Sequence, residues 1–307
     1  MSAQVYLHHY PASLFSEKIR LLLGYLGVPW HSVETSSIMP RPLLMPLTGG
    51  YRKTPNLQIG ANVYSDTAVI TTGLIRLTGD TTLYAPGFAA HRVAQWADST
   101  LFQVTVAMNF RPEAIGAAMS RLSAEEVAAF QADRAQLSEG APIVGIPPDA
   151  ALTSFQAYLA QLEHSLDTPF LFGAAPCIAD FSLYHCLWFV AQNAANAACL
   201  EPWGRVREWM ARMQAFGHGP VTDSTGESAL EHARACEPVL PEIEPLALEG
   251  IETGTDVTIA ATDYGRNPIA GRLMAVSSEE IIIARSSPET GALLNHFPTV
   301  GFLISRA

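Results

Sequence analysis

The spacing of apolar and polar residues in the first 80 positions predicts a small α/β unit. Residues 4–8 alternate apolar and polar side chains, as a half-buried strand does, with Val5 and Leu7 on one face. A helix from about Ser13 to Leu26 is expected next, because apolar residues recur there at helical spacing. Further elements are predicted as strands at 30–33, 56–59 and 62–64 and a helix at 66–77. The resulting order is β-α-β-loop-β-β-α, with the loop at 35–50.

From about residue 88 to 235 the pattern becomes helical. One apolar stripe is formed by Trp96, Thr100, Val104 and Met108 and is ended by Pro112. Residues 178–198 are apolar on all sides, which is typical of a helix buried at the centre of a bundle. Further helices are expected at 122–137, 151–166 and 203–216, with a proline-rich connector at 142–149.

After a proline-rich linker near residue 240, short β-rich runs separated by turn signals predict a small antiparallel β module at 250–307. The runs are 256–261, 269–276, 280–285 and 301–306. A unit of this size buries too little surface to be stable alone, so we expect it to pack on the helical region or on a partner chain. We expect a structural or interaction role for it.

Composition narrows the classes of function. The chain has 307 residues, of which 49% are hydrophobic and 15% charged, so a folded core is expected. The net charge of −11 argues against nucleic acid as a partner, because phosphate binding needs basic patches. The first 80 residues carry six basic and four acidic residues, a net +2, and are the better place for a small anionic ligand.

Neither a secretory signal nor a membrane span is expected. The start lacks a basic region followed by an apolar run, and the apolar stretch near 181–200 is interrupted by His185, Gln192 and Asn193. A cytoplasmic location is therefore expected. The cysteines, at 177, 186, 199 and 236, form no C-x-x-C pair and suit no disulfide framework.

Three segments, in this order along the chain, carry a family resemblance. They are HHYPASLFSEKIRLLLGYLGVPW from His8, KTPNLQIGANVYSDTAVI from Lys53 and FLFGAAPCIADFSLYHCLWF from Phe170. They resemble the first strand-loop-helix, the proline turn with its hairpin and ligand-binding helix, and the helix-capping segment of glutathione S-transferases. The resemblance implies an α/β thioredoxin-like domain at 1–80 followed by an all-α helical domain at 88–235. The β module at 250–307 lies outside the family's usual architecture.

The resemblance also implies a function. Glutathione would be the co-substrate, its thiol would be transferred to an electrophilic small molecule, and the protein would be a homodimer that needs no metal. The alternative is a non-catalytic protein that uses the glutathione-binding fold for binding or assembly. Retention on immobilised glutathione, together with turnover of a panel of electrophiles, would discriminate the two.

Ser13 is the predicted catalytic residue. It lies at the start of a predicted helix, where unpaired backbone N–H groups favour an anion. A hydroxyl there can donate a hydrogen bond worth roughly 1.5–3 kcal/mol to a thiolate. At about 1.4 kcal/mol per unit, that bond lowers a thiol pKa near 8.5 by about one to two units. Through the spacing Ser13-x6-Arg20, the resemblance implies that Ser13 faces the glutathione sulfur.

Alternatives to this role of Ser13 stay open. Serine is a favoured N-cap residue, so Ser13 could serve only to cap the helix. Tyr6 and Tyr10 are competitors, because some subclasses of the family use a tyrosine hydroxyl, and Tyr6 is the better match to them. A glutaredoxin-like reaction is not expected, because the first 176 residues contain no cysteine to attack a disulfide.

By the same resemblance the tripeptide is bound by Lys53, Thr54, Pro55, Asp66 and Thr67. Pro55 is expected in cis, so that the backbone of Thr54 pairs with the cysteinyl backbone like an added strand. Thr67, at a helix start, would hold the γ-glutamyl carboxylate, and Asp66 would pair with the ammonium group. Lys53 or Arg52 would reach the glycyl carboxylate. The alternatives are an ordinary trans-proline and a helix that Ser65 or Asp66 only caps.

Other conspicuous residues are interpreted as structural. Asp180 follows Cys177 by three positions and can cap the helix that begins there. His8 and His9 point to opposite faces of a strand, and His232 with Cys236 forms only half of a metal site. A pocket for the second substrate, or simply core packing, would use Trp96, Met108, Phe110, Trp188 and Phe189.

Overall fold

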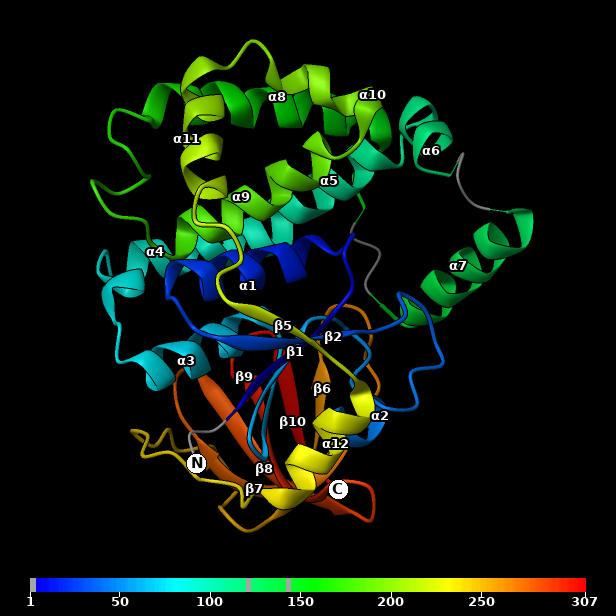
Figure 1. Cartoon of the computed structure of the whole chain (residues 1–307), viewed down its shortest axis with the longest axis vertical. Helices are drawn as coiled ribbons and strands as arrows, with labels where there is room; N and C mark the ends of the chain where they lie inside the picture. Colours follow the sequence, from blue (N-terminus) through cyan, green and yellow to red (C-terminus); the bar gives the residue numbers. More distant parts are fainter. Residues whose placement is uncertain (1–3, 120–122, 142–144) are drawn as a thin grey trace.

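The structure is a computed structural model that describes residues 4–119, 123–141 and 145–307. Helices form one half of the molecule and a long twisted sheet forms the other, with α1 between them (Figure 1). The expected helix start at Leu122 and the first part of the expected connector, 142–144, lie outside the described residues.

The amino-terminal unit has the predicted order of elements. These are β1 (Val5–His9), α1 (Leu14–Tyr25), β2 (Trp30–Glu34), α2 (Met45–Thr48), β3 (Asn56–Ile59), β4 (Asn62–Ser65) and α3 (Thr67–Thr78). The predicted bounds agree to within about two residues, and the loop at 35–50 contains one helical turn, α2. The thioredoxin-like prediction for this part of the chain is confirmed.

The helical region follows. Its elements are η1 (Thr82–Tyr84), α4 (Phe88–Trp96), η2 (Ala97–Leu101), α5 (Phe102–Asn109), α6 (Pro112–Met119), α7 (Ala124–Leu137), α8 (Pro148–Ser165), α9 (Ile178–Ala191), α10 (Ala194–Ala197), η3 (Ala198–Leu200) and α11 (Gly204–Gln214). Helix α9 is buried on nearly all sides, against α1, α4, α5 and α11. It ends at Ala191, earlier than predicted, because Asn193 caps the separate helix α10 through the Ala195 N–H at 3.1 Å.

The predicted stripe from Trp96 to Met108 is wrong at Thr100, which is exposed. The turn η2 is a π-helix, and its wider turn shifts the residues that face the core. The buried positions on this stretch are Ala94, Ala97, Leu101, Val104, Thr105 and Met108. The buried face of this stretch therefore includes Leu101 instead of Thr100.

After α11 the chain returns to the first sheet. Strand β5 (Val221–Ser224) pairs in parallel with β2, and α12 (Gly226–Ala235) packs below the sheet. Ala229 and Ala233 of α12 form a small core with Tyr6 and Val33. Helices α1 and α3 cover the opposite face. Residues 221–235 were predicted as part of the helical domain at 88–235, because neither β5 nor α12 was recognised from the sequence.

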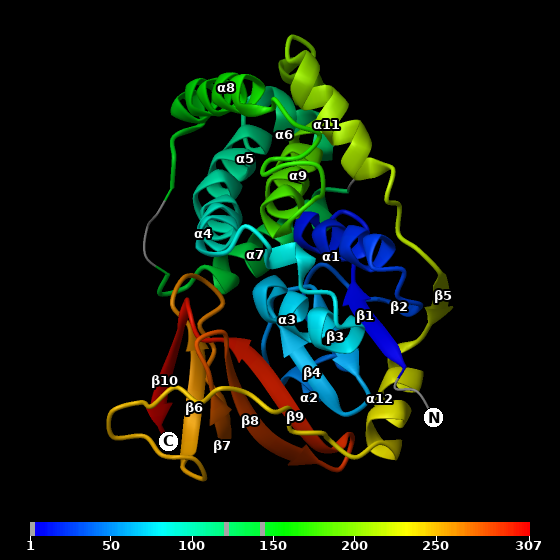
Figure 2. The ribbon, with the colours of Figure 1, turned by 90° about the vertical axis from the view of Figure 1, so that its left-hand side faces the viewer.

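The carboxyl-terminal strands are β6 (Asp256–Ala261), β7 (Ile269–Val276), β8 (Glu280–Ser287), β9 (Gly291–Pro298) and β10 (Phe302–Arg306). They extend the first sheet into one sheet of order β10-β6-β7-β8-β9-β4-β3-β1-β2-β5. Strand β9 pairs in parallel with β4, whereas the module's other pairs are antiparallel. Figure 2 shows the module beside β4 and below the helices.

The expectation that the module packs on the helical region or on a partner chain is thus wrong in its main contact. The strand that joins it to the first unit, β9, was not predicted, because Asn295 and His296 interrupt its apolar pattern. Both are fully buried and have polar partners. Asn295 donates to the Leu47 carbonyl at 2.8 Å, and His296 Nδ1 lies 2.8 Å from Glu280.

Within residues 4–119, 123–141 and 145–307, every helix is too short or too polar to cross a membrane.

Candidate glutathione site

Strand register brings three predicted site segments to one end of the sheet. His8 of β1 lies opposite Asn56 of β3, and Asn56 lies opposite Ser65 of β4. The turn before β3, the start of α3 and the loop into α1 therefore meet there. Two hydrogen bonds shape the turn: Ser65 Oγ donates to Asn56 at 2.8 Å, and Asn56 Nδ2 donates to the Lys53 carbonyl at 2.9 Å.

Ser13 is the N-cap of α1 and is buried. Its Oγ accepts the Ser16 N–H at 3.2 Å, and its own N–H donates to the Tyr10 carbonyl at 3.1 Å. No acceptor for the Ser13 hydroxyl proton lies within hydrogen-bond distance in the described part of the chain. Capping uses the oxygen as acceptor, so the same group can still donate to a ligand.

Tyr6 is placed away from Ser13. It packs on the α12 face of the sheet, 4.7 Å from the ring of His31, and its hydroxyl donates to Gln4 at 2.7 Å. It therefore lies across the sheet from α1. Tyr10 is part of the loop that leads into α1, and its carbonyl accepts hydrogen bonds from Ser13 and Arg20.

The Thr54–Pro55 peptide bond is cis, as the resemblance implied. The Thr54 hydroxyl accepts a hydrogen bond from the buried Arg41 at 2.9 Å. Arg52 donates to Asp133 of α7 at 2.7 Å, so its charge is already paired. Of the two cations considered for the glycyl carboxylate, Arg52 is thus held in an ion pair with the helical region.

Asp66 caps α3 by accepting the Ala68 N–H at 3.0 Å. It is the one non-glycine residue with positive φ, 96°, among the described residues. Strained backbone of this kind persists where the surroundings impose it, which is common at ligand sites. Burial raises the pKa of Asp66, and the Lys53 ammonium and the Ala68 N–H partly offset this rise.

Thr67 is buried at the first turn of α3, and its Oγ1 accepts a hydrogen bond from Lys18 Nζ at 3.1 Å. Lys18 is itself buried and pairs with Asp98 at 2.6 Å. Asp98 in turn lies 2.8 Å from His185 of α9. Burial raises the pKa of Asp98, but Lys18 and the His185 hydrogen bond outweigh it and lower that pKa to about 2.

Sequence reasoning missed this buried Lys18–Asp98–His185 chain. Its one signal was a lysine on the helix that follows Ser13, among residues with helical apolar spacing. These three side chains connect α1, the π turn and α9 to the start of α3. They therefore fix the two helix starts that face the candidate ligand.

The carboxyl-terminal module also reaches the site. Lys53 Nζ pairs with Asp263 at 2.5 Å and lies 4.3 Å from the ring centroid of Tyr264. Both residues belong to the β6–β7 loop, residues 262–268. No local pattern could have placed this loop, because Lys53 and Asp263 are 210 positions apart. Lys53, one of the predicted site residues, therefore contacts the carboxyl-terminal module.

Phe15, Phe102 and Tyr264 form a group of neighbouring aromatic side chains that the sequence did not single out. Phe102 lies 4.9 Å from the ring of Phe15 and 6.4 Å from the ring of Tyr264. Of the predicted set, Met108 is fully buried and Phe110 is exposed, while Trp96 and Trp188 pack against the main core. The core-packing interpretation therefore holds for Trp96, Met108 and Trp188.

The residues interpreted as structural have structural partners. Asp180 accepts the Cys177 N–H and the Trp209 indole N–H, each at 2.9 Å. His8 lies 3.2 Å from Gln58, and His9 lies 2.9 Å from Ser32. Over the described residues, no group of three or more metal-ligating side chains comes together.

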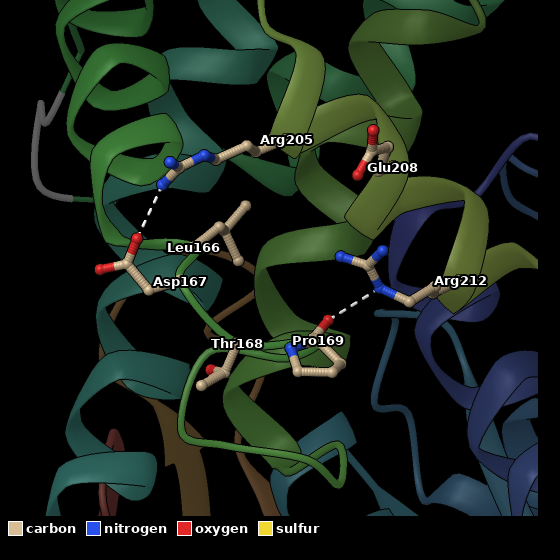
Figure 3. Close-up of a pocket in the computed structure, with 7 residues that line it drawn as sticks. All are labelled: Leu166, Asp167, Thr168, Pro169, Arg205, Glu208 and Arg212. Atoms are coloured by element: carbon tan, nitrogen blue, oxygen red, sulfur yellow. Dashed lines mark hydrogen bonds and ion pairs between the residues drawn. The ribbon is translucent and has the colours of Figure 1, made fainter.

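A surface hollow near α11 lies outside the candidate glutathione site. Charged side chains that line it are paired with groups of the same chain (Figure 3). Arg205 pairs with Asp167 at 2.7 Å, and Arg212 donates to the Pro169 carbonyl at 2.9 Å. We therefore do not treat it as a ligand site.

A thioredoxin-like sheet with a cis-proline turn, followed by a helical region built around α9, defines the glutathione S-transferase fold. Family comparison agrees: residues 7–81 match the glutathione S-transferase N-terminal domain and residues 117–212 match its C-terminal domain. The chain belongs to the glutathione S-transferase family.

Two solved structures resemble this chain to different extents. A glutathione S-transferase-like protein from Pseudomonas syringae is 37% identical, with a TM-score of 0.82 over 99% of this chain and 100% of that chain. A glutathione S-transferase from Rhodospirillum rubrum is 15% identical, with a TM-score of 0.51 over 69% of this chain and 88% of that one, and shows the fold alone. The first match thus extends through the module. No curated protein matches the chain.

Proposed function

We propose that the protein binds glutathione and activates its thiol for transfer to an electrophilic small molecule. The observation that carries the proposal is the meeting of three elements at one end of the sheet. These are the buried Ser13 hydroxyl at the start of α1, the cis Thr54–Pro55 turn and the start of α3 at Asp66 and Thr67.

In this proposal Ser13 acts on the sulfur. Its hydroxyl donates to the thiolate while its oxygen continues to accept the Ser16 N–H. The N-terminus of α1 adds favourable potential for the negative charge. The thiolate then attacks the electrophilic carbon, a carbon–sulfur bond forms, and a leaving group such as halide departs with the bonding electron pair.

The remaining residues would hold the tripeptide. The backbone of Thr54 pairs with the cysteinyl residue, Thr67 receives the γ-glutamyl carboxylate, and Asp66 receives the ammonium group. Lys53 can take the glycyl carboxylate only by sharing its ammonium with Asp263, which its three N–H donors allow.

Titration calorimetry with glutathione, followed by turnover of a panel of halogenated and other electrophiles, tests the proposal. We expect binding and measurable conjugation with at least one electrophile class. Absence of heat and of retention on immobilised glutathione would contradict the proposal as a whole.

A non-catalytic binding role is the second candidate. This role is favoured because two side chains proposed to bind glutathione already have partners in the protein. Thr67 accepts a hydrogen bond from Lys18, and Lys53 pairs with Asp263. Binding of glutathione without conjugation of any electrophile would support it over the transferase.

We also propose a cytoplasmic homodimer, as in the family. Strand β9 covers the edge of β4, so a dimer would have to use another surface than that edge. Light scattering at micromolar concentration should give twice the chain mass of 33.1 kDa. A mass of one chain would contradict the dimer.

A further inference from the structure

The β6–β7 loop is fastened between the candidate site and the helical region. The Gly265 N–H donates to the Leu137 carbonyl at 2.8 Å, and Arg266 donates to the Gly140 carbonyl at 2.6 Å. Asp263 holds Lys53 at 2.5 Å. In Figure 2 the orange segment that joins β6 to β7 rises against α7. The β6–β7 loop is therefore held by Lys53 on one side and by the end of α7 and the residues after it on the other.

These contacts place Tyr264 among the groups proposed to bind glutathione. Its ring lies under the Lys53 ammonium at 4.3 Å and stacks toward Phe102 at 6.4 Å. Burial raises the pKa of its phenol, and the carboxylate of Asp263, the phenol of Tyr10 and the carboxylate of Asp66 raise it further. The phenol therefore keeps its proton at neutral pH and is a hydrogen-bond donor.

Tyr51 connects the same place to the core of the module. Its ring packs against Phe297 and Phe302, at 6.0 and 6.1 Å. Its hydroxyl is buried and has no hydrogen-bond partner among the described residues. Such a group lacks the partner that buried polar atoms ordinarily have. Burial raises the pKa of this phenol, and the nearby carboxylate of Asp66 raises it further.

We propose that the β6–β7 loop forms one wall of the glutathione site and that Tyr264 donates a hydrogen bond to the bound tripeptide. The proposal rests on the proposed function. The site is then composite, with its sulfur-facing residue near the amino terminus and one wall near the carboxyl terminus. A ligand bound by Lys53 meets Tyr264, because the Tyr264 ring lies 4.3 Å from the Lys53 ammonium.

Calorimetry with glutathione on full-length Tyr264→Phe and Tyr264→Ala tests this. Tyr264→Phe removes only the hydroxyl and should weaken binding about 2- to 10-fold, the range for one neutral hydrogen bond. Tyr264→Ala also removes the ring under Lys53 and should weaken binding by about tenfold or more. The matched control is Tyr158→Phe, on α8 beside Trp96, which should bind as the wild type does. Melting curves verify that each variant is folded.

Each outcome decides the proposal. If the wild type binds and both Tyr264 variants bind equally well, the wall is refuted while the proposed function stands. If the wild type does not bind but Tyr264→Ala does, the loop blocks the site instead of lining it, and the proposal is overturned. If none of the three binds, glutathione is not the ligand, and the proposed function fails together with the wall.

Discussion

At the scale of single residues, Ser13 combines two roles that the sequence analysis set against each other. Its oxygen accepts the Ser16 N–H and so caps α1, while its proton has no acceptor within the described residues. A hydroxyl is both donor and acceptor, so capping and sulfur activation are compatible. Replacement of Ser13 by alanine removes both the helix cap and the hydroxyl donor, so this variant alone cannot separate a loss of stability from a loss of catalysis.

We predict that Ser13→Ala lowers turnover at pH 7 by about tenfold or more and leaves glutathione affinity nearly unchanged, because the hydroxyl acts on the sulfur. Ser13→Gly is the matched control, since glycine costs a helix N-cap only a few tenths of a kcal/mol and brings no hydrogen-bond donor. Steady-state kinetics should find both variants slow, and melting curves should find the alanine variant less stable than the control variant. Full activity of either variant, with loss in Tyr10→Phe or Tyr6→Phe, would move the role to that tyrosine.

Asp66 is the second residue whose charge can be tested apart from its structural role. Asp66→Asn keeps the cap on the Ala68 N–H and tolerates a positive φ, but removes the charge. We predict that it weakens glutathione binding by roughly 1–3 kcal/mol, the range for a charged hydrogen bond, with an unchanged melting temperature. Calorimetry that gives wild-type affinity would mean that Asp66 only caps α3.

At the scale of elements, β1 carries two histidines inside the sheet. Burial lowers the pKa of His8 to about 4, and the hydrogen bond to Gln58 offsets only part of that effect. Burial and the nearby Arg20 lower the pKa of His9 to about 4 as well. The folded state therefore keeps both imidazoles neutral, whereas the unfolded chain binds protons below about pH 6.5.

The sign of the effect on stability follows from this difference. The contribution of each histidine is fully present above pH 6.5 and is lost as pH falls from 6.5 to about 4. We predict that urea unfolding at pH 7 and pH 4.5 gives a smaller drop in free energy for His8→Gln than for the wild type, by about 2 kcal/mol. The exposed His164→Gln is the control and should drop as the wild type does. If the free energy of unfolding of His8→Gln dropped as much as that of the wild type, the lowered pKa of His8 would be contradicted.

At the scale of the whole molecule, the module is part of the first domain's sheet instead of an appended unit. Glu280 is buried between Arg76 of α3 and His296 of β9, and Tyr64 of β4 stacks on His296 at 4.2 Å. Burial raises the pKa of Glu280, but His296 and Arg76 lower it overall. Separating the module would leave Arg76, Tyr64 and the β4 edge without these partners and would remove one of the two partners of the buried Glu280, which is costly for a buried charge.

We therefore predict one cooperative unfolding transition for the full chain in scanning calorimetry. A chain ended after Glu237 should melt at lower temperature and expose apolar surface around Tyr51, because its partners Phe297 and Phe302 are removed. Binding of a hydrophobic dye would report that surface. Two resolved transitions in the full chain, or a truncated chain as stable as the whole, would show that the module is independent.

The sequence by itself determined the local features of this protein. The spacing of apolar residues located β1, α1, β3, β4 and α3 to within about two residues, because period and caps are properties of neighbouring residues. The candidate site residues were also recognised from short segments: a serine before α1, a proline before β3 and the Asp-Thr pair at the start of α3. The family resemblance ordered them into one site, and strand register brings them to the same end of the sheet.

Only the tertiary structure decided what lies beside that site. Strand β9 joins β4 through buried Asn295 and His296, whose polar side chains hide the strand from any pattern of hydrophobicity. Lys53 meets Asp263 across 210 positions, and Lys18 meets Asp98 across 80. Such pairs depend on which sheet edge is free and which loop can reach it, and these are properties of the folded chain as a whole.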